Sequence, residues 1–304
     1  MLRTTALALV LIAGQAAAET ACDEVSFSDV GWTDITTTTS VAKQILTALG
    51  YDVDVSVLSV PVTFASLSGG DTDIFLGNWM PAQSGAIEQY LSDGSIESVH
   101  ENLTGTIYTL AVPSYTYEKG LIDFADIAKF ADELDETIYG IEPGNEGNAY
   151  LVSLIDANTH GLGEFEVKES SEQGMLSQVR RAYKKSDDVV FLGWAPHPMN
   201  VNFELNYLTG GEEFFGGEGV VNTVTRKGFV AECPNVGKLL TQLDFTVAME
   251  SEIMGAILND GEDPDKAVQA WVSANPTVLD GWLADVTTTK GEPGLPAVQA
   301  AFGL

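Results

Sequence analysis

Apolar and polar residues follow two different periods along this chain. Short β-branched apolar runs, typical of buried strands, recur between longer segments with helical spacing, which is the pattern of an α/β fold. The predicted strands or extended segments cover residues 25–30, 53–60, 73–76, 106–112, 137–141, 189–192 and 223–229. The predicted helices cover residues 36–49, 63–67, 81–91, 124–134, 149–158, 170–185 and 264–274.

Several of these helices carry recognisable start and stop residues. Asp34 is a candidate N-cap for helix 36–49, and Gly50 is placed to end it. Pro81 is placed to begin helix 81–91. Ser170 and Gln173 have the spacing of a capping box, which predicts that the helix ending near residue 185 begins there.

The first 18 residues have the parts of a secretory signal peptide. Arg3 precedes the apolar run 6–13, and the alanines at 16–18 supply the small residues that cleavage requires. This run is about half of the roughly 20 residues needed to cross a bilayer, and no other apolar stretch reaches that length. We therefore predict that residues 1–18 are removed on export and that the mature chain is soluble.

The two cysteines of the chain, Cys22 and Cys233, are predicted to form a disulfide, because exported proteins with a single pair usually join it. Two unpaired buried thiols are the alternative. The bridge would bring the C-terminal third back to the first part of the chain. The predicted layout is one discontinuous lobe (residues 19–105 and 210–304), one inserted lobe (residues 106–209) and two strands that cross between them.

The net charge of the chain limits the classes of partner that it could bind. Against 44 acidic residues the chain has 14 Lys and Arg, a net charge of -30. Nucleic acids and anionic membranes attract basic surfaces, so both are disfavoured as partners. A solubilising acidic surface accounts for the charge better than the steering of a ligand does.

The tryptophans carry the most informative pattern. Trp32, Trp79 and Trp194 each follow a strand-like run and stand beside glycine or a polar residue. The carboxyl ends of strands line the ligand crevice of open α/β sheets, so three matching positions favour a ligand site over core packing. Trp271 and Trp282 have ordinary apolar spacing in the C-terminal helical region, and we predict that they pack in the core or on the surface.

Aromatic rings at such a crevice suit a ligand with a permanent positive charge. Ring faces carry negative charge density, and a quaternary ammonium has no N–H for an acceptor, so rings are its natural receptor. Asp34, two residues after Trp32, is a candidate counter-charge, with helix capping as its alternative role. Asn145, in the Gly-rich loop 144–147, is a candidate donor to a ligand hydroxyl, with ordinary turn formation as the alternative.

Eight segments spread over the mature chain carry a resemblance to a known family. They are residues 29–34, 58–63, 75–81, 139–148, 169–178, 190–200, 233–240 and 259–264. In these segments the chain resembles the choline-binding periplasmic proteins of bacterial ABC importers, within the wider family of glycine betaine and choline binders.

The resemblance implies a type II periplasmic binding protein fold, in which two lobes joined by a two-strand hinge close over a ligand in the cleft. It implies a box of four rings formed by Trp32, Trp79, Tyr108 and Trp194. By the same likeness, Asp34 faces the ammonium and Asn145 holds the alcohol. The expected function is capture of choline, or acetylcholine, in the periplasm by a monomer that needs no cofactor or metal and delivers the ligand to an ABC permease in the inner membrane.

Alternatives from other classes have little support in the sequence. Histidines occur only at positions 100, 160 and 197, and there is no nucleophile elbow, HExxH motif or P-loop, which disfavours a secreted hydrolase. The acidic segment 259–263 lacks the ligand spacing of a calcium loop. It is better suited to capping the helix that begins at Pro264.

The nearest alternatives are other ligands of the same kind: glycine betaine, carnitine and trimethylamine N-oxide. The carboxylate of a betaine requires cationic or N–H donors, whereas Asp34 beside the rings would repel it. We therefore predict an alcohol or an ester in preference to a betaine.

Overall fold

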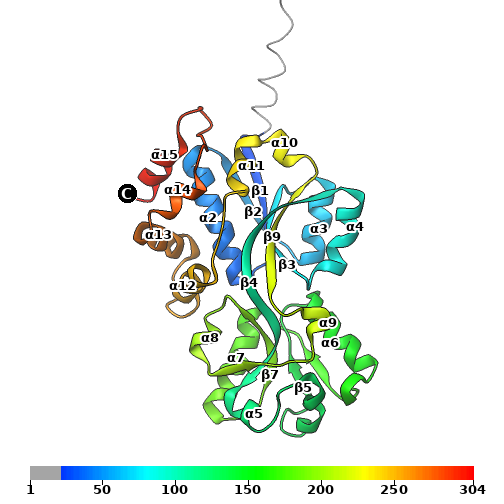
Figure 1. The fold of residues 1–304 in the computed structure, drawn as a ribbon. Coiled ribbons are helices and arrows are strands. Elements are labelled where there is room, and N and C mark those ends of the chain that lie inside the picture. The colour runs from blue at the N-terminus through cyan, green and yellow to red at the C-terminus, as the bar shows by residue number, and fades with distance from the viewer. Residues whose placement is uncertain (1–21) are drawn as a thin grey trace, which may run out of the picture.

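The computed structural model describes residues 22–304, which form two lobes connected by long strands (Figure 1). We call the part that contains β1–β3 lobe A and the part that contains β5–β7 lobe B. The predicted α/β fold with two lobes is confirmed. The predicted signal peptide lies outside the described residues. Within residues 22–304, none of the helices has the length and apolar character to cross a membrane.

Nine strands of the described chain form one continuous sheet in the order β2-β1-β3-β9-β4-β7-β5-β6, with β8 also paired to β4. Their bounds are β1 (Glu24–Asp29), β2 (Asp52–Val57), β3 (Ile74–Met80), β4 (Ile96–Pro113), β5 (Thr137–Tyr139), β6 (Glu166–Lys168), β7 (Val190–Ala195), β8 (Leu205–Tyr207) and β9 (Gly219–Arg226). Strands β1–β3 run parallel to one another, as do β5–β7, while β4 and β9 are antiparallel to their neighbours. The carboxyl ends of the parallel strands therefore form crevice edges in each lobe.

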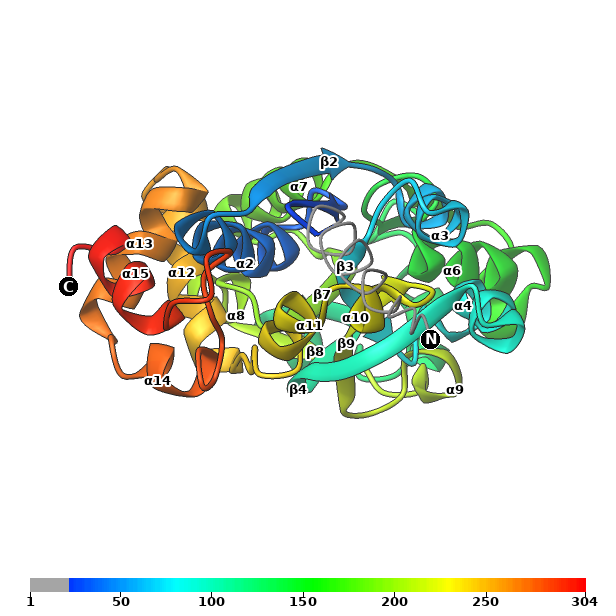
Figure 2. The same ribbon diagram turned by 90° about the horizontal axis from the view of Figure 1, so that it is seen from above.

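Helices pack on both faces of each half of this sheet. In lobe A they are α2 (Thr33–Leu49), α3 (Val60–Gly69), α4 (Ser84–Asp93), α10 (Phe229–Glu232), α11 (Pro234–Leu240), α12 (Val247–Leu258), α13 (Pro264–Ala274), α14 (Val278–Trp282) and α15 (Gly294–Ala301). In lobe B they are α5 (Ser114–Glu118), η1 (Phe124–Phe130), α6 (Glu146–Asp156), η2 (Thr159–Gly161), α7 (Glu172–Lys185) and α8 (Met199–Asn202). Helix α9 (Glu212–Phe215) belongs to the returning segment, and its rings Phe214 and Phe215 pack against Tyr150 and Phe124 of lobe B. Viewed from above, the C-terminal helices α12, α13 and α15 gather around α2 on one side, and α3 and α4 lie on the other (Figure 2).

Strand β4 is the element that joins the two lobes. Residues 96–106 pair with β9, and residues 107–113 pair with β7 and β8. Only 106–112 was predicted as a strand. The missed half is polar and contains three register shifts against β9, which obscure the alternation of a regular strand. The predicted lobe boundaries at residues 105/106 and 209/210 stay a prediction.

Three start residues predicted from capping signals are wrong, and α3 and α6 each begin three residues earlier than predicted. The N-cap of α2 is Trp32, not Asp34, and it makes no side-chain capping bond. Helix α4 begins at Ser84, because Pro81 lies in the preceding turn. Helix α7 is capped by Ser171, whose hydroxyl accepts a hydrogen bond from the Gly174 N–H at 3.1 Å, so the predicted cap at Ser170 is one residue early. Gly50 ends α2 in the left-handed conformation at φ 101°, as predicted.

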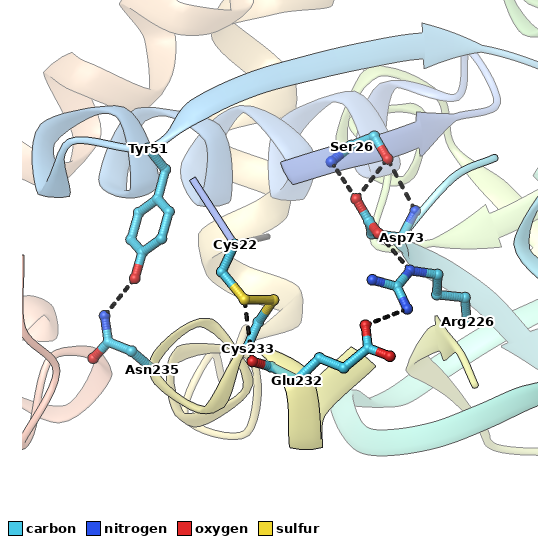
Figure 3. Close-up of a disulfide and its surroundings, with 8 residues drawn as sticks. All are labelled: Cys22, Ser26, Tyr51, Asp73, Arg226, Glu232, Cys233 and Asn235. Carbon is cyan, nitrogen blue, oxygen red and sulfur yellow. Dashed lines mark hydrogen bonds and ion pairs between the residues drawn. A yellow bond between two sulfur atoms is a disulfide. The ribbon is translucent and has the colours of Figure 1, made fainter. Parts of the chain in front are cut away.

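The predicted disulfide between Cys22 and Cys233 is present and ties the start of the described chain to the segment before α11 (Figure 3). Nearby, the Asp73 carboxylate accepts hydrogen bonds from the Ser26 N–H at 2.8 Å and from the Arg226 Nε at 2.7 Å. These contacts link β1, the start of β3 and the end of β9. The C-terminal part of the chain therefore returns to lobe A.

Candidate functional site

All six residues singled out from the sequence line one cavity: Trp32, Asp34, Trp79, Tyr108, Asn145 and Trp194. Four more residues complete its wall: Ala82, Gln83, Ile141 and Glu146. Three of the predicted residues come from lobe A, two come from lobe B, and Tyr108 stands on β4 just past its crossing point. The cavity therefore lies between the lobes.

Two tryptophans occupy matching positions on strands of the two lobes. Trp79 is the second-last residue of β3, and Trp194 is the second-last residue of β7. Each is followed two residues later by a proline with a cis peptide bond. β3 and β7 run four and three residues further than predicted, so these indoles belong to the strand ends themselves.

The register between β4 and β7 brings in the phenol ring. Tyr108 is paired directly with Trp194, so their side chains emerge on the same face of the sheet. The Tyr108 ring lies 6.3 Å from the Trp79 ring, centroid to centroid, at an interplanar angle of 65°. Phe215 packs edge-on against Tyr108 at 5.0 Å and supports it. Rings from both lobes thus face one space.

The Asp34 carboxylate contacts Trp79 in the cavity wall and does not cap its own helix. Its Oδ2 accepts a hydrogen bond from the Trp79 Nε1 at 3.0 Å, and the residue is 1% exposed. Burial, together with the nearby Glu172 carboxylate, raises the pKa of Asp34 to about 7, although the bond from Trp79 opposes this. The carboxylate is thus fixed against one ring and costly to ionise without a cation nearby.

Asn145 is held in a single orientation by its carbonyl oxygen. Oδ1 accepts hydrogen bonds from the Tyr108 hydroxyl at 2.9 Å and from the Gly147 N–H at 2.8 Å, which caps α6. A Cβ at Gly147 would overlap the Tyr108 hydroxyl, so only glycine allows this approach. Because the oxygen already accepts these hydrogen bonds, the NH₂ group is the part of Asn145 that can bind a ligand, as a donor.

Four buried polar atoms of the cavity wall have no hydrogen-bond partner within residues 22–304: Trp32 Nε1, Asp34 Oδ1, Gln83 Nε2 and Glu146 Oε1. Buried polar groups in native proteins are nearly always paired, and each unpaired one costs about 1–3 kcal/mol. Their concentration around one cavity indicates a polar or charged ligand.

Carboxyl groups crowd around the cavity, and their pKa values are raised. Burial raises the pKa of Glu146 to about 7, with Glu142 adding to the effect. Burial also raises the pKa of Glu142. Glu250 of α12 is 1% exposed, and burial followed by the field of Asp34 raises its pKa far above the usual range. A cation in the cavity would relieve this accumulation of negative charge.

Residues 23–274 match the family of substrate-binding domains of ABC-type glycine betaine transport systems. The chain belongs to this family. Its members are the substrate-binding components of transporters and not enzymes, which excludes the hydrolase considered from the sequence.

Known structures resemble this substrate-binding protein closely. An ABC-transporter choline-binding protein in complex with choline is 56% identical, with a TM-score of 0.91, and the match covers 93% of this chain and 99% of that one. A choline-binding protein in an unliganded semi-closed conformation is also 56% identical, with a TM-score of 0.86, and the match covers 93% of this chain and 100% of that one.

A curated relative is named for ligands other than choline. The glycine betaine/carnitine transport binding protein of Listeria monocytogenes is 27% identical over 188 residues, which is 61% of this chain and 60% of that protein.

Three acidic or polar residues of this substrate-binding protein escaped the sequence analysis. Glu146 lies in the loop 144–147 that was singled out, and Glu142 lies two residues before it, so the acidic residues around Asn145 were the signal that could have identified them. Gln83 lay inside the predicted helix 81–91, where nothing distinguished it. Its Oε1 accepts a hydrogen bond from the Asn78 Nδ2 at 3.1 Å, and its Nε2 is one of the unpaired atoms.

The two tryptophans predicted to pack away from the site do so. Trp282 is 2% exposed, and its ring packs against Phe245 at a centroid distance of 5.9 Å. Trp271 is partly buried, and its Nε1 donates to the Glu252 Oε2 at 2.6 Å. Neither lines the cavity between the lobes.

Proposed function

We propose that this substrate-binding protein captures choline between its lobes and delivers it to an ABC permease. One observation carries the proposal: three indoles and a phenol from both lobes share a cavity with a buried carboxylate, Asp34. Each ring contributes about 0.5–2 kcal/mol to holding a quaternary ammonium. Choline has about seven heavy atoms, and the ceiling of about 1.5 kcal/mol per atom permits micromolar binding.

The alcohol end of choline is proposed to bond to the free NH₂ group of Asn145. Its oxygen is occupied by Tyr108 and by the cap of α6, so the NH₂ group presents two donors of fixed direction. The choline-bound structure at 56% identity supports the choice of ligand. Trp32, Trp79, Tyr108 and Trp194 then hold the ammonium end, with Asp34 as counter-charge.

Glycine betaine is the rival ligand, because the family description and the Listeria relative carry its name. The residues around the cavity disfavour it. None of the ten residues that line the cavity in the described chain is Lys or Arg, whereas Asp34 and Glu146 are acidic. A betaine carboxylate would be placed against like charge without a compensating cation.

Titration calorimetry with choline, acetylcholine, glycine betaine and trimethylamine N-oxide tests this assignment. We expect choline to bind more tightly than glycine betaine by at least tenfold. Tighter binding of glycine betaine would overturn the ranking, and no heat with any of the four would overturn the proposed function.

We further propose that the protein works as a periplasmic monomer whose lobes (residues 19–105 with 210–304, and residues 106–209) close by bending at the strands between them. The proposal includes export through cleavage after residue 18. N-terminal sequencing and sedimentation of the exported protein test both points. A retained N-terminus or a stable dimer would contradict them.

A further inference from the structure

A buried polar contact outside the cavity wall joins the two lobes. It consists of Thr33 in lobe A and of Glu172 and His197 in lobe B, and we call it the interlobe carboxylate contact. The three residues are 6%, 3% and 2% exposed, respectively. None of them lines the cavity, so the proposed ligand site does not explain why these polar groups are buried here.

Both oxygens of Glu172 are engaged in this contact. Oε2 accepts a hydrogen bond from the Thr33 N–H at 2.9 Å. Oε1 accepts from the Thr33 hydroxyl at 2.9 Å and lies 3.1 Å from the His197 Nε2. Hydrogen bonds to a charged group are worth about 1.5–3 kcal/mol each when buried. The carboxylate is thus held from both lobes at once.

The backbone fixes which nitrogen of His197 carries the proton. The Met199 N–H donates to His197 Nδ1 at 2.9 Å, so Nδ1 is an acceptor without a hydrogen. Nε2 must then carry the proton and donate it to Glu172. His197 therefore acts as a rigid donor that orients the carboxylate toward lobe A.

Helix α2 lacks a capping side chain of its own. Its N-cap is Trp32, which has no side-chain oxygen, and no side-chain capping bond is formed there. Glu172, the first residue of α7, supplies an acceptor to the first turn of α2 from the other lobe. The negative charge also suits the positive ends of both helix dipoles. This end of α2 is therefore capped only while the lobes are together.

The contact also adjoins the box of four rings in both lobes. Thr33 directly follows Trp32, and the His197 ring packs edge-on against Trp194 with centroids 4.9 Å apart. Holding Thr33 and His197 in place therefore also positions one ring of the box in each lobe, Trp32 in lobe A and Trp194 in lobe B. We propose that Glu172 is a positioning residue that locks the closed state and sets Trp32 and Trp194 around the ligand. This inference rests on the proposed function for the identity of the ligand and for the closure of the lobes.

Glu172→Gln tests the inference, because the amide places an NH₂ group against donors from Thr33 or His197 and breaks the contact without changing the size of the side chain. Asp188→Asn is the matched control. The Asp188 side chain is also only 7% exposed, but its bonds to the Thr116 hydroxyl at 2.7 Å and to the Lys119 Nζ at 2.8 Å stay inside lobe B.

Two measurements are made on the full exported chain. The first is affinity for choline and for tetramethylammonium, which lacks the hydroxyl. The second is the distance distribution between spin labels placed at exposed Val62 of α3 and Val152 of α6, with and without ligand. The native cysteines are paired and do not interfere with labelling.

We expect Glu172→Gln to weaken both ligands by the same factor, about tenfold, and to shift the label distances toward the open form. Asp188→Asn should change neither. Affinity lost without a change in distances would mean that Glu172 acts on the cation by its charge alone and would overturn the inference. Unchanged affinity and distances would overturn it as well.

Thr33→Val covers the case in which Glu172→Gln fails to fold. It removes one hydrogen bond and no charge, so a smaller loss of affinity, with a shift in label distances, is expected. In the Glu172→Gln background Thr33→Val should have no further effect, and full additivity would contradict direct coupling. If the unmodified protein binds no quaternary ammonium, the proposed function fails, while the label distances of the ligand-free proteins still test the contact.

Discussion

The cavity tryptophans and the C-terminal Trp282 of this protein are almost equally buried, yet their surroundings differ. Trp79 and Trp194 are 7% and 4% exposed, and Trp282 is 2% exposed. The Trp282 Nε1 donates to the Asp244 backbone oxygen at 3.1 Å, so this ring is satisfied by its own lobe. The Trp32 Nε1 has no partner within residues 22–304. Position at or just after a strand end, and not burial, distinguishes a ring that lines the cavity from a core ring.

Trp194→Ala and Trp282→Ala should separate these two classes most strongly. Removing the Trp194 ring takes away cation–π contact and should weaken choline binding at least tenfold, measured by calorimetry, while the ligand-free protein stays folded. Trp282→Ala should leave the affinity nearly unchanged but lower the free energy of unfolding by about 3–5 kcal/mol, measured by denaturant titration. Equal losses of affinity in the two variants would contradict the assignment of Trp194 to the ligand site and of Trp282 to the core.

Choline affinity should also depend on pH, because the counter-charge titrates near neutrality. The pKa of Asp34 in the ligand-free protein is raised to about 7, and a bound cation lowers it. Above pH 7 the carboxylate is already ionised. Below pH 7 binding must displace a proton, so the affinity should fall about tenfold between pH 8 and pH 6. Calorimetry in buffers of different ionisation enthalpy would measure the released proton.

Asp34→Asn is the control for this pH dependence. The amide cannot titrate, so the variant should bind more weakly at pH 8 and lose most of the slope. Glu146 also has a pKa raised to about 7 and lines the same cavity, so Glu146→Gln should remove any slope that remains. A full slope in Asp34→Asn would assign the titration to Glu146 or to another carboxyl group.

Local sequence signals predicted the parts of the fold that local physics decides. Helix α13 begins at Pro264 with Asp263 as N-cap and ends at Ala274, as its start residues and its spacing indicate. Gly50 marks the end of α2 for the same reason. In these cases the deciding hydrogen bonds lie within four residues of the signal.

Long-range contacts decided what the sequence pattern missed. Asp34 looked like a helix cap, but its carboxylate bonds to the indole of Trp79, 45 residues away. Tyr108 has no spacing signal, and only the pairing of β4 with β7 places its ring beside Trp194. Before the structure, Tyr108 could be named through family resemblance alone. The contact of Glu172 with the other lobe could not be predicted from the sequence for the same reason, since its partner Thr33 is 139 residues away.

The smallest effect concerns the polar end of the cavity, where Asn145 is set against the rings. Asn145→Ser keeps a side chain that can cap α6 but removes the NH₂ donor. One neutral hydrogen bond is worth about 0.5–1.5 kcal/mol, so choline affinity should fall roughly twofold to tenfold. Tetramethylammonium has no hydroxyl, and its affinity should stay unchanged in the same calorimetric titration. Equal losses for the two ligands would show that Asn145 shapes the ring box through Tyr108 instead of recognising the alcohol.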